Sequence, residues 1–154
     1  MGLSLGVGLA LAGKKKNIKY KVYVLIGDGE CNEGAVCEAS MSASHFGLDN
    51  LTLILDKNNF QQTGPNNVIM GLGNLNHKWE SFGWDIIEID GHDIVQIFSA
   101  FKEKIKKNKP RLIIANTFKG KGFSFTENNN KWHHSPLSRS QYDIALSELT
   151  RTSK

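Results

Sequence analysis

The sequence has 154 residues, of which 40% are apolar and 22% are charged. A chain of this size and composition can bury a single core, which excludes a wholly disordered protein. The formal net charge is +4, and lysines are concentrated at positions 14–16 and within residues 102–109. A basic chain can bind nucleic acid, a membrane surface or phosphorylated small molecules. Because no aromatic residues interleave these lysines, we favour a solvated lysine face and expect no nucleic-acid binding.

The apolar residues near the amino terminus, 2–12, are too few to span a bilayer. Lysines follow this stretch, whereas a signal peptide carries its positive charges in front. We therefore expect no membrane association. Cys31 and Cys37 are six positions apart without paired histidines nearby, which argues against a disulfide framework and against a zinc site. Free thiols in a reducing, cytoplasmic location are the expectation.

Helix-like and strand-like segments alternate along the chain. Short runs of branched apolar residues predict buried strands, and apolar residues at helical spacing predict helices. In chain order the pattern predicts a helix at 3–12, a strand at 22–26, a helix at 35–46, a strand at 51–55, a polar loop from 58 to about 76, a strand at 84–89, a helix at 94–105 with one apolar stripe, a strand at 112–115 and a closing helix at 141–149. This alternation is typical of an α/β fold, a parallel sheet with helices on both faces. Such sheets bind ligands at the carboxyl ends of their strands.

Two polar motifs follow the first two predicted strands. Gly27-Asp28-Gly29 comes directly after the first, and Asn58 follows the second, thirty positions beyond Asp28. A right-handed crossover between parallel strands brings both motifs to the same edge of the sheet. One carboxylate and one amide oxygen at a common point suit Mg²⁺, which completes its shell with phosphate oxygens and water. The glycines would let the backbone turn sharply and approach a bulky anion, beside the helix that starts near Gly34.

Each motif taken alone has a plainer explanation. Gly-Asp-Gly is a common turn after a strand, and Asn-Asn is a common loop pair. Their joint occurrence after successive strands is more specific, and it favours a site for a metal-bound phosphate cofactor.

Four longer segments narrow this interpretation: GDGECNEG with the AVCEA that follows it, HFGLDNLTLILDKNNFQQTG, WESFGWDIIEIDGHD and TFKGKGFSFTENNNKWHH. The spacing of GDG and NN resembles the thiamine diphosphate signature, and the segments together resemble the transketolase family over nearly the whole chain. The resemblance implies a thiamine diphosphate-binding fold with thiamine diphosphate and Mg²⁺ as cofactors. Glu33 favours transketolases over two relatives, the deoxyxylulose-phosphate synthases and the 2-oxo-acid dehydrogenase subunits.

The resemblance implies a cofactor-binding set that comprises Gly27, Asp28, Gly29, Glu30, Asn58 and Phe60. Within it, the side chains of Asp28 and Asn58 and the main-chain oxygen of Phe60 would be the Mg²⁺ ligands. The backbone of Gly29 would contact the cofactor diphosphate.

Two further residues receive catalytic roles from the resemblance. Glu33 would be the acidic residue at the subunit interface that helps to couple paired cofactors, and His133 an active-site histidine near the diphosphate and the substrate. Each has an alternative, because Glu33 could be a carboxylate favoured by a helix dipole and His133 could be a surface histidine. His134 stands where the family often has glycine, which leaves the assignment between the two histidines open.

Other candidates have simpler explanations. His45, His77 and His92 are expected to pack or to be solvated, with His92 in a turn that caps the next helix. Lys119 and Lys121 lie in a glycine-rich loop where they could meet phosphate. Solvated lysines are the simpler expectation for both.

The resemblance also implies that residues 1–154 form a single, partial thiamine diphosphate-binding domain. The family's domain begins upstream of Met1, and a second domain binds the pyrimidine ring. A truncated gene, a fragment or one part of a split enzyme would explain this. A split enzyme would form a homo- or hetero-oligomer with a pyrimidine-binding transketolase domain or subunit, and it would transfer a two-carbon ketol unit between sugar phosphates. The alternative is a non-catalytic relic that binds the cofactor weakly or only with a partner.

Overall fold

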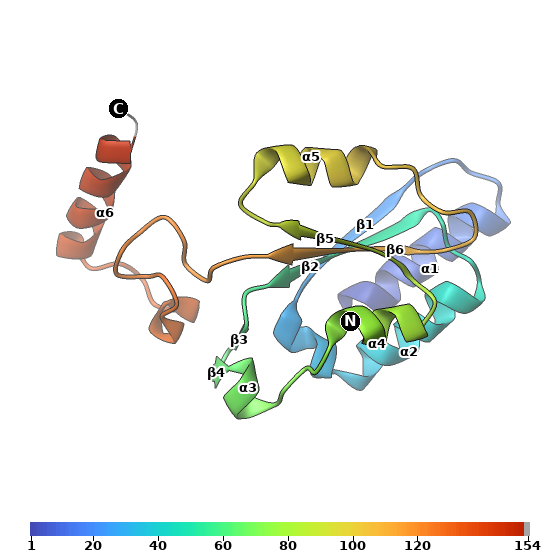
Figure 1. The fold of residues 1–154 in the computed structure, drawn as a ribbon, viewed down its shortest axis with the longest axis horizontal. Helices are drawn as coiled ribbons and strands as arrows, with labels where there is room; N and C mark the ends of the chain where they lie inside the picture. The colour runs from blue at the N-terminus through green and yellow to red at the C-terminus, as the bar shows by residue number, and fades with distance from the viewer. Residues whose placement is uncertain (153–154) are drawn as a thin grey trace.

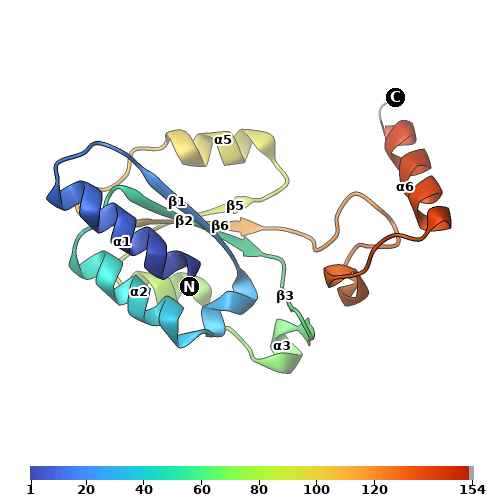
Figure 2. The same ribbon diagram turned by 180° about the vertical axis from the view of Figure 1, so that it is seen from behind.

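The structure is a computed structural model, and it describes residues 1–152. Four parallel strands form the central sheet in the order β1 (Val22–Gly27), β2 (Leu51–Lys57), β6 (Arg111–Asn116) and β5 (Asp85–Asp90). One face of the sheet is covered by α1 (Gly2–Lys15), α2 (Gly34–His45) and α4 (Leu75–Ser81), and the other by α5 (Ile94–Lys102), as Figure 1 and the opposite view in Figure 2 show. The predicted α/β fold with helices on both faces of a parallel sheet is confirmed.

The remaining elements lie beyond the carboxyl ends of the strands (Figure 1). A short antiparallel hairpin, β3 (Phe60–Gln61) and β4 (Gly64–Pro65), leads into α3 (Asn66–Ile69). A 3₁₀ turn, Asp28–Asn32, joins β1 to α2. After β6 the chain forms a long loop, a 3₁₀ turn at Asn130–His133 and α6 (Arg139–Thr152), which projects away from the sheet.

The larger part of the core lies between the sheet and α1, α2 and α4. The central strands β2 and β6 are buried along most of their length because other elements cover both of their faces. Trp79 and Trp84 pack edge to face with ring centroids 5.0 Å apart, and Trp84 Nε1 donates to the Ser40 carbonyl. A smaller cluster under α5 comprises Ile89, Ala100, Ile113 and Ala115.

The helix predicted at 94–105 is shorter than expected. α5 ends at Lys102, and the backbone of Glu103 is no longer helical. The cause is Arg111, a buried guanidinium that pairs with the buried Asp85 at 3.0 Å. Arg111 also donates to the carbonyl oxygens of Glu103 and Lys104. These bonds hold the chain after α5 in a non-helical path.

The apolar stripe predicted on this helix is only partly covered. Ile97 packs against the smaller core cluster. Ile94 and Phe98, in contrast, are 75% and 59% exposed. The reason is that, among the described residues, α5 alone covers this face of the sheet.

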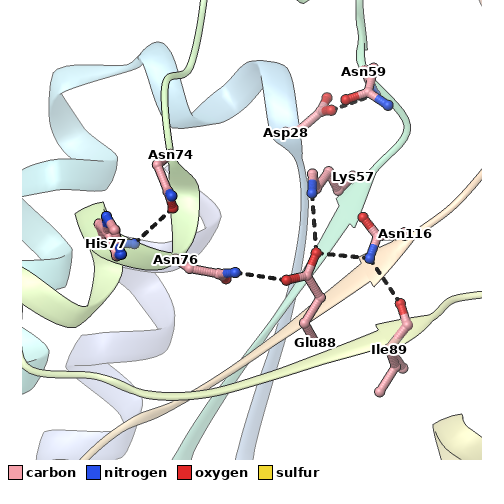
Figure 3. Close-up of polar contacts among 9 residues, drawn as sticks. All are labelled: Asp28, Lys57, Asn59, Asn74, Asn76, His77, Glu88, Ile89 and Asn116. Carbon is pink, nitrogen blue, oxygen red and sulfur yellow. Dashed lines mark hydrogen bonds and ion pairs between the residues drawn. The ribbon is translucent and has the colours of Figure 1, made fainter.

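A polar cluster joins the carboxyl ends of three strands. Glu88 of β5 accepts hydrogen bonds from Lys57 of β2 at 3.2 Å, Asn116 of β6 at 2.9 Å and Asn76 of α4 at 2.7 Å (Figure 3). The two asparagine amides, together with the Lys57 ammonium, lower the pKa of Glu88 to about 2. The cluster therefore fixes the strand ends from which the polar loops depart.

Membrane association and the state of the two cysteines were also predicted. No helix within residues 1–152 combines the length and the apolar character that a membrane span requires. Cys31 and Cys37 are both free, as expected. Burial raises the pKa of the Cys31 thiol to about 12, so Cys31 stays protonated.

Replacing Glu88 with glutamine should destabilise the fold at neutral pH and have less effect in acid. The folded-state pKa of about 2 lies below the ordinary value of 4.5, so the carboxylate stabilises the fold above the ordinary value and loses this contribution as the pH falls toward 2. Urea unfolding across a pH series should show a difference between the wild type and E88Q that shrinks through this window. Glu80→Gln, at an exposed position of α4, is the matched control and should differ little from the wild type. A pH-independent difference for E88Q would contradict the assignment.

Candidate functional site

The loops that follow β1 and β2 meet at one edge of the sheet. Gly27 pairs with Asp56 in the register of the two strands, so Asp28 and Asn58 leave the sheet side by side. The Asn59 N–H donates to Asp28 Oδ2 at 2.6 Å and ties the second loop to the first (Figure 3). The predicted convergence of the two motifs is confirmed, while the metal-ligand role of their side chains stays a prediction.

The fold buries the Asp28 carboxylate completely. Its Oδ2 accepts the Asn59 N–H, but within residues 1–152 its Oδ1 has no hydrogen-bond partner. Burial raises the pKa of Asp28, and Asp56 adds to the rise, while the Asn66 amide and the backbone N–H groups of Asn59 and Gly29 oppose it. A buried carboxylate oxygen without a partner is unfavourable, and a bound cation would supply the missing interaction.

Asn58 is held by hydrogen bonds at both ends of its amide. Its Nδ2 donates to Asp56 Oδ2 at 3.0 Å, and its Oδ1 accepts the Phe60 N–H at 2.9 Å. Asp56 in turn accepts a hydrogen bond from the Thr117 hydroxyl. The orientation of the amide is thereby fixed, and a lone pair of Asn58 Oδ1 remains for a cation. Asp56 and Thr117 were not predicted as site residues, although Asp56 belongs to the same motif as Asn58.

Three oxygen atoms at this site are of the kind that binds a hard divalent cation. They are the free Oδ1 of Asp28, the Oδ1 of Asn58 and the main-chain oxygen of Phe60, and Mg²⁺ prefers oxygen ligands of this kind. Across residues 1–152, no group of three or more His, Cys, Asp or Glu side chains forms another metal site. The residues present therefore suit Mg²⁺ at the position that the sequence predicts.

A cavity of about 530 Å³ opens beside these loops. Its walls come from the turn after β1, the loop after β2 and the loop after β6. The predicted site residues that line it are Gly27, Gly29, Glu30, Glu33, Asn58, Phe60 and His133. Of the predicted set, Asp28 alone does not line it, since its side chain is fully buried.

The glycines of the first motif were expected to allow a sharp turn and a close approach to an anion. Neither Gly27 nor Gly29 has a positive φ angle, so the turn does not depend on glycine, while the close approach stays a prediction. A Cβ atom at Gly29 would lie 2.9 Å from Gln61 Cγ, so a side chain there would push against the β3 hairpin. Glu30 Oε1 accepts the Gly27 N–H at 2.9 Å and fixes the turn.

Lys119 and His133 lie next to each other on the wall of the cavity. Lys119 is half-buried, lines the cavity and has its Nζ 3.1 Å from His133 Nδ1, whereas Lys121 is exposed. Of the two lysines, Lys119 is therefore the one placed to meet a phosphate. Desolvation and the positive charge of Lys119 lower the pKa of His133, which favours the neutral imidazole. The His134 ring packs edge-on against the His133 ring at 4.4 Å, and His133 is the histidine that lines the cavity.

His92 supports the loop that carries Lys119. The predicted turn before α5 exists, but its capping residue is Asp93, whose Oδ1 accepts the Val95 N–H at 2.8 Å. His92 Nε2 instead accepts the Phe118 N–H at 2.9 Å, and its ring stacks on Phe118. This contact fixes the residue next to Lys119.

Glu33 occupies the N-cap position of α2, where the helix dipole favours a carboxylate. Its side chain is exposed and lies on the cavity wall. The structure thus agrees with the simpler alternative for Glu33, and the interface role stays a prediction.

The chain is similar in sequence and in fold to known transketolases. Residues 2–150 match the family described as transketolase, thiamine diphosphate binding domain. The chain is 42% identical over 150 residues to one subunit of the apulose-4-phosphate transketolase from Phocaeicola vulgatus, an alignment that covers 97% of this chain and 53% of that protein. It is 38% identical over 149 residues to human transketolase, covering 96% of this chain and 24% of that protein. The crystal structure of transketolase from Campylobacter jejuni superimposes with a TM-score of 0.85 at 33% identity, covering 97% of this chain and 24% of that one.

The chain spans about half the length of the Phocaeicola vulgatus protein and about a quarter of human transketolase. The family match covers nearly all of its residues, and its fold agrees with the solved transketolase. The chain therefore belongs to the transketolase family and is a thiamine diphosphate-binding domain of it.

Proposed function

We propose that this chain is the part of a transketolase that binds Mg²⁺ and the diphosphate end of thiamine diphosphate. With a partner that carries the pyrimidine-binding domain, it would transfer a two-carbon ketol unit between sugar phosphates. The observation that carries the proposal is the fully buried Asp28 carboxylate, whose Oδ1 lacks a partner among the described residues at the point where the Asn58 loop meets it. The Phocaeicola vulgatus relative, itself one subunit of a transketolase, supports a multi-chain assembly.

One set of groups in the chain would bind the metal, and another would bind the phosphate. Asp28, Asn58 and the Phe60 carbonyl would hold Mg²⁺, which would neutralise negative charge on the diphosphate. Lys119 and His133 supply positive and hydrogen-bonding groups across the same cavity. Thiamine diphosphate supplies the electron sink that allows a carbon–carbon bond next to a carbonyl to break.

His133 is the residue suited to proton transfer. Its lowered pKa favours the neutral form, which can accept a proton from a hydroxyl or, once protonated, return it to an oxygen. Lys119, 3.1 Å away, would orient the ring and stabilise negative charge on the substrate. Glu33, which also lines the cavity, would contribute to a subunit interface and couple paired sites.

Replacing Asp28 with asparagine should separate binding from stability. The substitution keeps the acceptor for the Asn59 N–H but removes the charge. Mutation of residues that only support metal ligands already lowers metal affinity by about 10–100-fold. Loss of a ligand charge should therefore weaken Mg²⁺-dependent binding of thiamine diphosphate by more than roughly 100-fold. Because burial raises the pKa of Asp28, the charge destabilises the metal-free fold at neutral pH, and D28N should be at least as stable without metal. Calorimetric titration and thermal unfolding measure the two effects, with the exposed Asp143→Asn as control. Unchanged cofactor affinity in D28N rules out the metal assignment.

The proposed division of labour predicts that residues 1–154 bind the cofactor but need a pyrimidine-binding domain for transfer. This chain alone should bind Mg²⁺ and thiamine diphosphate without transferring ketol units from a ketose phosphate to an aldose phosphate. Addition of a transketolase subunit that carries the pyrimidine-binding domain should restore transfer, measured by product formation at a saturating cofactor concentration. Cofactor binding without transfer, across partner subunits that demonstrably associate, would favour the non-catalytic alternative.

In the active assembly, His133→Ala should lower kcat by roughly 10²–10⁴-fold, the range for loss of a positioned general acid or base. His134→Ala should have a much smaller effect, because the His133 ring is the one on the cavity wall. Steady-state kinetics of both variants decide between the two histidines. Equal losses, or a larger loss for H134A, would transfer the role to His134.

A further inference from the structure

Asn66 is a buried amide beside the Asp28 carboxylate. It is the first residue of α3, and only 5% of its surface is exposed. Its backbone N–H donates to the Asn59 carbonyl at 2.9 Å, while the Asn59 N–H binds Asp28 Oδ2 at 2.6 Å. The fold thus ties Asn66 and Asp28 to the same residue.

The rest of the protein leaves the Asn66 side chain without partners. Within residues 1–152, neither its Nδ2 nor its Oδ1 has a hydrogen bond of normal geometry, and Asp28 Oδ1 lacks one as well. The Asn66 amide nevertheless lies within reach of a hydrogen bond to the Asp28 carboxylate. Buried amides and carboxylates are almost always hydrogen-bonded, because removing them from water without a partner is unfavourable. Unpartnered atoms on two neighbouring buried side chains indicate that a ligand completes the arrangement.

We propose that Asn66 is a positioning residue of the metal site, whose amide holds the Asp28 carboxylate in the orientation that binds Mg²⁺. This inference rests on the proposed function. Its Nδ2 would donate to the carboxylate when the metal is bound, and this bond would decide which carboxylate lone pairs face the cation. The neighbouring Asn67 is exposed and has no such position.

The decisive substitution is Asn66→Leu, which is close in shape but has no donor. In calorimetric titrations of the full chain with Mg²⁺ in the presence of thiamine diphosphate, N66L should weaken the apparent Mg²⁺ affinity by roughly 10–100-fold. The thermal midpoint of the metal-free protein should stay equal or rise, because two unpartnered buried atoms are removed. Asn66→Thr, which keeps a donor, should recover part of the affinity, and the exposed Asn67→Leu should match the wild type.

Each outcome bears on the inference. Wild-type Mg²⁺ affinity in N66L would show that Asn66 is only an unpartnered core group, and the inference would be wrong while the proposed function stands. Should N66L fail to fold, Asn66→Ala carries the same expectation and the same contradiction. Absence of Mg²⁺-dependent cofactor binding in the wild-type chain would overturn the proposed function, and the inference with it.

Discussion

The hydrogen bond from the Asn59 N–H to the buried Asp28 carboxylate is the contact around which the site is built. It joins the loop after β1 to the loop after β2, and it does so with a charged group in the protein interior. Burial raises the pKa of this carboxylate, which means that the fold without a cation works against the ionised form. On the proposed function, a bound divalent cation would reverse this balance, and part of its binding free energy would come from relieving an electrostatic penalty already present in the fold.

The sheet supports this contact through the alternation of side chains along β2. Asp56 and Asn58 line the cavity. Lys57, which lies between them, points to the other face of the sheet and pairs with Glu88 (Figure 3). Consecutive residues therefore have different roles. Asp56 and Asn58 present oxygen atoms to the cavity, and Lys57 holds the end of β2 against β5 through Glu88. A substitution on the Glu88 side would loosen the position of Asn58 without touching any ligand atom. Support of this kind keeps a metal site within the narrow geometry that Mg²⁺ requires.

The sequence predicts the helices and strands that have a periodic apolar pattern, and the motifs that directly follow apolar strands. Strand and helix order, the parallel sheet and the convergence of Asp28 and Asn58 follow from periodicity and crossover geometry. The short β3, β4 and α3 elements do not, because two to four residues carry no period. The early end of α5 depends on Arg111, which is held by Asp85, and the place of Lys119 depends on the contact between His92 and Phe118. Each of these two pairs is separated by 26 positions, which no local sequence pattern spans. Asn66 carries no motif at all, and only its burial beside Asp28 draws attention to it.

Exposure gives a physical reason why the proposed chemistry needs a further surface over the cavity. His133 and Glu33 are exposed and Lys119 is only half-buried, so their charges are screened by water. Hydrogen-bonding and charged groups act strongly on a developing charge only where water is excluded and the donors are fixed. Metal binding places no such demand on this chain, because the Asp28 carboxylate is already buried. On the proposed function, the single chain suffices for the diphosphate and the metal. A partner surface over the cavity would then turn the exposed histidine into an effective proton-transfer group.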